Sequence, residues 1–351
     1  MKKTLVITII SATSLFATPI TAAPLDVYGD FRLRFQSRTG DTDSATKGDF
    51  TLMRTRVNLD GDLGEDWRFY SRLAIDEAAG KAHNNGLYDT SGAFDRWGVQ
   101  RKFPGGSIKL GRQDIVLGQE GLALTTLIDA VGENNQLTGA TVTVKVDSHT
   151  TLKAVGGRLG DGLFEAALTP AFSPGHPPTI NANLYAVQVN HKVDQRLSVG
   201  GTYRTIATID NTSSYWAKRL PPNKDVFHTS TLFGNYYLNP KTAIYTELGQ
   251  SNADQYNFAA GVGIGHILDR KNSVSLNYFK QDKNSGMFAN WGAPDFARNL
   301  KGNNNTSWTG LAAYLRHSLD KNTMLELSDY YEKGNNTNTA NQSRITLSTS
   351  F

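Results

Sequence analysis

Residues 27–36 read VYGDFRLRFQ, and two kinds of side chain alternate along the whole stretch. Every second position is apolar or glycine, and the positions between them carry Tyr28, Asp30, Arg32, Arg34 and Gln36. A period of two residues is typical of a β-strand, because successive side chains of a strand point to opposite faces. The stretch therefore predicts a strand with one apolar face and one strongly polar face.

The same alternation continues along the chain in segments of roughly 9 to 12 residues, the length that a tilted strand needs to cross a bilayer. It predicts sixteen strands, at residues 27–37, 50–63, 67–77, 93–103, 106–113, 137–147, 149–158, 182–193, 196–207, 226–238, 241–251, 256–268, 272–282, 307–319, 322–333 and 342–351. Tight turns alternate with mostly longer connections between them. This rhythm favours an all-β fold, a closed transmembrane antiparallel barrel with an even number of strands.

Closure is expected on physical grounds, because hydrocarbon cannot satisfy the N–H and C=O groups of an open sheet edge. A soluble β-sandwich or β-helix is the alternative for a chain of alternating strands. The sequence shows neither a Pro- or Ser-rich linker between two domains nor a repeat of fixed period, and both observations disfavour these soluble folds.

The composition narrows the classes further. The chain has 351 residues, of which 39% are hydrophobic and 19% charged, and it has no cysteine. No apolar run of 18 or more residues follows residue 23, which excludes a polytopic helical membrane protein. The absence of cysteine excludes disulfides, thiolate metal sites and cysteine nucleophiles. The 14 Tyr, 16 Phe and 5 Trp residues argue against a disordered chain.

The amino terminus has the pattern of a bacterial secretory signal. Lys2 and Lys3 precede an apolar stretch at residues 5–16, and small residues follow, up to Ala22 and Ala23. We expect cleavage after Ala22, which gives a signal peptide at residues 1–22 and a single barrel domain at residues 23–351. Removal of the two lysines reduces 36 basic residues to 34, against 32 acidic ones. This near balance argues against binding to nucleic acid.

Catalytic and metal-binding patterns are weak. The seven histidines are scattered without the spacing of a zinc site, and we expect no metal and no cofactor. His317 and Ser318 are adjacent, as in a possible outer-membrane hydrolase, but adjacent strand residues point to opposite faces. The sequence therefore predicts no catalytic residues and no enzyme activity, with an outer-membrane hydrolase as the lower alternative.

A row of arginines falls on the polar phase of the first four predicted strands. Arginine at lipid depth costs roughly 2–4 kcal/mol, and so we expect these side chains to face water inside the barrel, as one basic wall. The wall consists of Arg32, Arg34, Arg54, Arg56, Arg68, Arg72 and Arg96. The alternative is that they pair with acids of the lumen and tie strands together. Arg112 falls on the lipid-facing phase with Ile108 and Leu110, unless the chain has already turned inward there.

The carboxyl end, RITLSTSF at residues 344–351, is the last element of the pattern, with Ile345, Leu347 and Phe351 on one face. In its terminal Phe351, its strand rhythm and its long connection after residues 109–113, the chain resembles the Gram-negative outer-membrane porins. The resemblance implies that Phe351 is the signal read by the barrel-assembly machinery. It also implies outer-membrane localisation, contact with lipopolysaccharide and a homotrimer.

In the porins that the chain resembles, the third long connection folds into the barrel and narrows it. Four acidic residues would then face the basic wall across this constriction. They are Asp114, Glu120, Asp129 and Glu133. A transverse field of this kind orients dipolar solutes and sets ion preference.

The function implied is passive diffusion of small hydrophilic solutes and ions through a water-filled channel. The alternative is a porin specific for sugars or organic anions, in which lumen aromatics serve as a stacking surface. The lumen-phase tyrosines available for this are Tyr28, Tyr70, Tyr314 and Tyr330. General lining of the lumen is the other interpretation of these residues.

Overall fold

The computed structural model describes residues 25–40, 48–80, 89–115, 117–118, 136–159, 182–208, 226–251, 258–282, 307–334 and 338–351. The predicted signal segment lies outside these ranges. The described residues form β1 (Asp26–Gly40), β2 (Gly48–Gly64), β3 (Trp67–Gly80), β4 (Asp89–Phe103), β5 (Gly106–Asp114), β6 (Gln136–Lys145), β7 (Thr150–Leu159), β8 (Ala182–Lys192), β9 (Leu197–Thr208), β10 (Val226–Asn239), β11 (Thr242–Ser251), β12 (Phe258–Ile267), β13 (Asn272–Gln281), β14 (Trp308–Ser318), β15 (Thr323–Gly334) and β16 (Thr339–Ser350). No helix in these ranges has the length and apolarity needed to cross a membrane.

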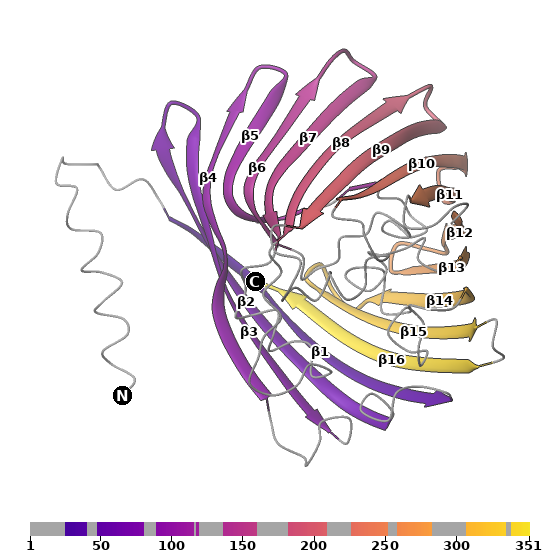
Figure 1. Ribbon diagram of the computed structural model, residues 1–351. Coiled ribbons are helices and arrows are strands. Elements are labelled where there is room, and N and C mark those ends of the chain that lie inside the picture. The colour runs from indigo at the N-terminus through magenta and orange to yellow at the C-terminus, as the bar shows by residue number, and fades with distance from the viewer. Residues whose placement is uncertain are drawn as a thin grey trace, which may run out of the picture.

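All sixteen predicted segments are strands, and they close into one antiparallel barrel (Figure 1). Each strand pairs with its neighbours in sequence, and β1 pairs with β16 over the stretch from Asp30↔Ser350 to Gly40↔Ala340. Closure leaves the sheet without an edge, which is the condition for placing strands in hydrocarbon. The predicted fold is confirmed.

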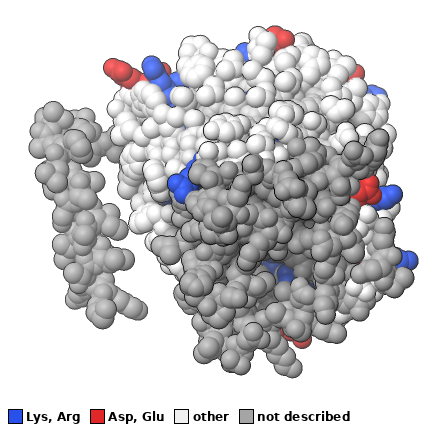
Figure 2. Space-filling view, viewed as in Figure 1, with Lys and Arg blue, Asp and Glu red and all other residues white. Residues whose placement is uncertain are grey.

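The outward face of the barrel is apolar. Large side chains such as Phe35 (51% exposed), Leu232 (67%) and Leu276 (51%) point away from the barrel, while their sequence neighbours Thr231 and Asn277 are buried on the inward face. In the view of Figure 2, the barrel wall carries few charged side chains, and most of them lie at its margins. The two-residue period therefore separates an apolar exterior from a polar interior.

Four tight turns at one end of the barrel share one hydrogen-bonding pattern. In each, an aspartate Oδ1 accepts backbone N–H bonds from the residues two and three positions later, at 2.6–2.9 Å. These hydrogen bonds, and at Asp269 first of all the one from the Asn272 side chain, favour the charged carboxylate and hold its pKa below the ordinary value. The four residues are Asp147, Asp194, Asp269 and Asp320. We call this end of the barrel the short-turn rim.

Candidate functional site

The inward face of β1–β4 carries all seven arginines that the alternation predicts. The register sets Arg32 opposite Arg54, and it sets Arg72 opposite Arg96. Arg54 and Arg72 are buried, and the other five are partly exposed. Most of the residues that alternate with them are apolar, and Phe35, Ile75 and Trp97 among them are exposed on the outward face. The structure thus gathers the predicted basic residues on one inward surface, which we call the arginine wall.

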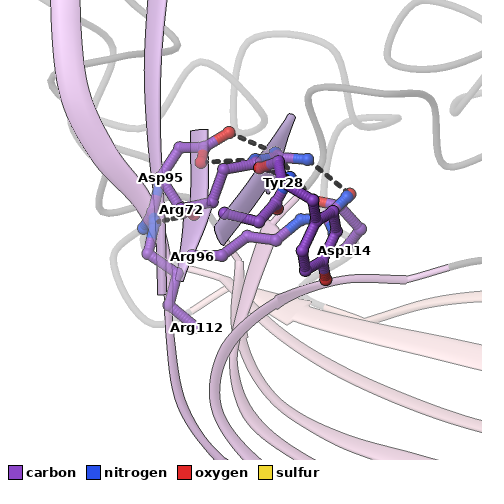
Figure 3. Close-up of polar contacts among 7 residues, drawn as sticks. Tyr28, Arg72, Asp95, Arg96, Arg112 and Asp114 are labelled. Carbon is purple, nitrogen blue, oxygen red and sulfur yellow. Dashed lines mark hydrogen bonds and ion pairs between the residues drawn. The ribbon is translucent and has the colours of Figure 1, made fainter. Parts of the chain in front are cut away.

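A β-bulge in β4 adds a carboxylate to this wall. The register shifts between Arg72↔Arg96 and Leu73↔Phe94, which leaves Asp95 without an opposite residue. Its side chain is 1% exposed, and Arg72 donates to it with Nε (2.7 Å to Oδ1) and with Nη2. Arg72 and Asp95 therefore form a buried bidentate pair (Figure 3).

Asp114, at the end of β5, joins the same cluster. It forms an ion pair with Arg96, and its Oδ2 lies 3.5 Å from Arg72 Nη1. Two arginines and two aspartates from three strands thus neutralise one another, as Figure 3 shows. Part of the arginine wall is therefore tied to acids, and the acid predicted for the constriction loop at position 114 lies on the basic side of the lumen.

Arg112, whose direction the sequence leaves open, lies where β5 approaches β4 closely. Gly111 has φ +116°, and a Cβ built on it would lie 2.3 Å from the Trp97 carbonyl oxygen, so the close approach requires glycine. Beyond it, Arg112 is 7% exposed, and its Nε donates to the backbone oxygen of Asp95 at 3.2 Å. The register sets Arg112 opposite Trp97, which is 47% exposed, as strict alternation along β5 predicts.

The third long connection begins inside the barrel. Leu117 is fully buried, and the backbone of Gly118 pairs with the side chain of Gln188 on the inward face of β8. Gly118 N donates to Gln188 Oε1 at 2.7 Å, and Gln188 Nε2 donates to Gly118 O at 3.1 Å. The chain thus reaches from β5 to β8 within four residues. The predicted constriction acids Glu120, Asp129 and Glu133 lie outside the described residues.

The arginine wall continues beyond the predicted set. Arg344 on β16 lies over the Tyr330 ring at 4.6 Å and donates to its hydroxyl at 3.1 Å. Tyr330 in turn packs edge-on against Tyr314, with ring centroids 5.6 Å apart. At the opposite side of the wall, Lys109 Nζ lies 4.1 Å from the Tyr70 ring.

Tyr28 has the lumen phase that the sequence predicts, and its hydroxyl donates to Asp60. Sequence analysis missed Asp95, Lys109 and Arg344. The available signal for Asp95 was an acid next to Arg96, at a position whose phase is otherwise apolar. Strict alternation assigns that position to the outward face, and for this reason Asp95 was missed. In the part of the chain that the structure describes, no group of three or more His, Cys, Asp or Glu side chains could hold a metal ion.

Similar folds occur among solved structures. A structure of Pseudomonas putida OprB matches with a TM-score of 0.64 and 10% identity, covering 93% of this chain and 94% of that chain. A triple mutant of Rhodopseudomonas blastica porin matches with a TM-score of 0.55 and 11% identity, covering 93% and 100%. No protein-family model matches the chain, and no curated protein matches it. At these identities the likeness concerns the fold, which is a porin-like barrel.

Proposed function

We propose that the chain is an outer-membrane diffusion porin, which lets small hydrophilic solutes and ions cross a lipid bilayer through the lumen of the barrel. Three features support this function: the closed sheet, the apolar outward face and the charged inward face. Proteins with this fold include two named porins, and that likeness favours a channel over an enzyme.

The arginine wall is the observation that carries the proposal. Its seven guanidinium groups lie on one inward surface, and any of them would cost roughly 2–4 kcal/mol at the bilayer midplane. The same strands expose Phe35, Ile75 and Trp97 on the other face. The free energy of the system is therefore lowest when lipid lies outside the barrel and water inside it.

The charge of the arginine wall also determines which ions the channel is expected to prefer. Arg72 pairs with Asp95 and Asp114 and stabilises the wall, and Arg32 and Arg56 lie partly exposed on the same inward surface. Fixed positive charge along a lumen raises the local concentration of anions and opposes the entry of cations. We propose a preference for anions, with Glu120, Asp129 and Glu133 of the third connection facing the wall at the constriction.

Charge reversal tests this proposal in planar bilayers. The wild-type protein is expected to show ohmic channels whose reversal potential in a salt gradient reports anion preference. Arg54→Glu with Arg56→Glu should move that reversal potential toward cation preference. Arg196→Glu changes charge by the same sign in a turn of the short-turn rim and serves as the control. An unchanged reversal potential in the double variant would refute the basic wall.

A porin specific for sugars or organic anions is the second candidate. Tyr28 on the lumen phase favours it, since this residue is 46% exposed beside the carboxylate of Asp60, whereas Arg344, Tyr330 and Tyr314 are each less than 7% exposed. This candidate predicts that one class of solute blocks the channel current saturably. A panel of sugars and organic anions that leaves the current unblocked would count against it.

The cellular setting completes the proposal. We propose that residues 1–22 are removed on export and that the barrel resides in the bacterial outer membrane beside lipopolysaccharide. We further propose that the assembly machinery recognises Phe351 and that the functional unit is a homotrimer. Cross-linking and native mass spectrometry of the detergent-extracted protein test the trimer.

The hydrolase alternative finds little support in the geometry. His317 Nδ1 hydrogen-bonds to Asn272 Oδ1 at 2.8 Å, on the outward face. An assay of phospholipid and ester hydrolysis in detergent tests the alternative directly, and turnover would overturn the proposal that the chain acts only as a channel.

A further inference from the structure

Three hairpins of the short-turn rim share one sequence pattern, a histidine followed two residues later by Val or Leu and then by the turn aspartate. The pattern occurs at residues 191–194, 266–269 and 317–320. In each, the histidine Nδ1 contacts a side chain on the neighbouring strand at 2.8–3.0 Å. The three partners are Thr150, Thr242 and Asn272. These contacts link adjacent hairpins around the rim.

At the first of these hairpins the hydrogen bonds determine the tautomer of His191. The Thr150 hydroxyl donates its single proton to Asp147 Oδ2 at 3.0 Å, so its oxygen must accept the proton on His191 Nδ1, 3.0 Å away. The lone pair of the neutral imidazole is then on Nε2. An imidazole whose Nδ1–H is held in this way is typical of a metal ligand.

A second imidazole lies beside it. The ring centroids of His149 and His191 are 6.4 Å apart, with the planes tilted by 46°, and both side chains are exposed. His149 Nδ1 contacts the Ser148 hydroxyl at 2.8 Å, and Nε2 is a free ligand when Nδ1 is the donor in this contact. Asp147 is occupied as a turn cap, because its Oδ1 accepts the backbone N–H groups of His149 and Thr150.

We propose that His149 and His191 form a binding site for a divalent transition-metal ion, with Cu²⁺ bound most tightly. With metal–nitrogen distances of about 2.0–2.1 Å, the observed centroid separation of 6.4 Å corresponds to two imidazole nitrogens on opposite sides of one ion. Imidazole suits Cu²⁺ and Zn²⁺, and a given site binds Cu²⁺ more tightly. The two histidines are the protein ligands, and water completes the coordination. This site is separate from the lumen and does not depend on channel activity.

His317 on the short-turn rim serves as the control for metal binding. Among the described residues, His317 has the same contact to a neighbouring strand, through Asn272 to Asp269, without a second imidazole in ring contact. The untagged full-length protein in detergent is titrated with Cu²⁺ alone, and electron paramagnetic resonance reports the nitrogen ligands. We expect one saturable equivalent with two nitrogen ligands in the wild type. His149→Gln and His191→Gln should each weaken binding by at least about tenfold, while His317→Gln should bind as the wild type does.

Thr150→Val tests the support of His191, because it keeps both imidazoles and removes the hydroxyl that accepts Nδ1–H and donates to Asp147. Loss of such a partner is expected to weaken binding by about tenfold. The proposal is overturned if the wild type shows no saturable site, if the double variant of His149 and His191 keeps its Cu²⁺ affinity, or if His317→Gln weakens binding as much as His191→Gln does. Far-ultraviolet circular dichroism of each variant confirms that the barrel is folded, so that loss of binding is assigned to the ligands.

Discussion

The backbone of Phe351 closes the barrel against Gly29. Phe351 N donates to Gly29 O and Gly29 N donates to Phe351 O, both at 3.0 Å. The ring of Phe351 lies over the glycine so closely that a Cβ at position 29 would be 2.6 Å from the ring, and also 2.2 Å from the carbonyl oxygen of Arg56. The absence of a side chain at Gly29 thus allows the last residue to dock on the first strand.

Gly29→Ala is therefore expected to destabilise the barrel, because the new methyl group overlaps both a backbone oxygen and the Phe351 ring. Overpacking of this kind costs about 1–3 kcal/mol. The measurement is the midpoint of thermal unfolding of the detergent-solubilised protein. Gly156→Ala is the control, since a Cβ there makes ordinary contacts at 3.5 Å with Tyr185. Equal midpoints for the two variants would show that the seam tolerates a side chain.

The pair of Arg72 and Asp95 gives a second prediction. Asp95→Ala leaves a guanidinium in a place where the arginine side chain is 3% exposed, and loss of one partner of a buried ion pair costs about 3–5 kcal/mol. Contacts of Arg72 with Asp114 place the expected loss at the lower end of that range. Unfolding in denaturant measures it.

The control for the buried pair is Glu326→Ala. It breaks the pair of Arg316 and Glu326, whose side chains are 34% and 16% exposed. Solvent screens such a pair, so the loss should stay below about 1 kcal/mol. If both variants lose the same stability, burial does not set the strength of the Arg72–Asp95 pair.

The strands were predictable because they depend on a period of two, which is a local property of the sequence. All sixteen segments follow from that period, and so does the shared face of Arg32 with Arg54 and of Arg72 with Arg96, while the role of the wall in lining a pore stays a prediction. The terminal role of Phe351 in assembly stays a prediction.

Where the period breaks, sequence reasoning fails. The bulge at Asp95 depends on how β3 and β4 align, and the burial of Arg112 against the Asp95 backbone depends on the close approach of β4 and β5 at Gly111. The neighbourhood of His149 and His191 depends on the pairing of β7 with β8, and the partner of Gly118 is on β8 as well. Each of these contacts joins residues whose spacing in the sequence carries no signal.

Acid should weaken the short-turn rim. The backbone N–H bonds lower the pKa of Asp194 in the folded state, so its contribution to stability is complete above the unfolded-state pKa and is lost as the pH falls through the folded-state pKa. We expect the thermal midpoint of the wild type to fall as the pH drops below about 4. Asp194→Asn keeps an acceptor oxygen but cannot titrate, and it should show a smaller decrease. A decrease of the same size in the variant would mean that other carboxylates account for the acid sensitivity.

Gln188 holds the start of the third connection inside the barrel, and its removal should change conduction without unfolding the protein. Gln188→Leu keeps the size of the side chain but removes both hydrogen bonds to Gly118. Freed of this link, residues 117–118 gain alternative positions in the lumen, so single-channel recordings should show altered conductance and more current noise. Thr141→Val changes another inward polar residue, on β6, and should conduct as the wild type does. Wild-type conductance and noise in Gln188→Leu would mean that the contact with β8 does not position the connection.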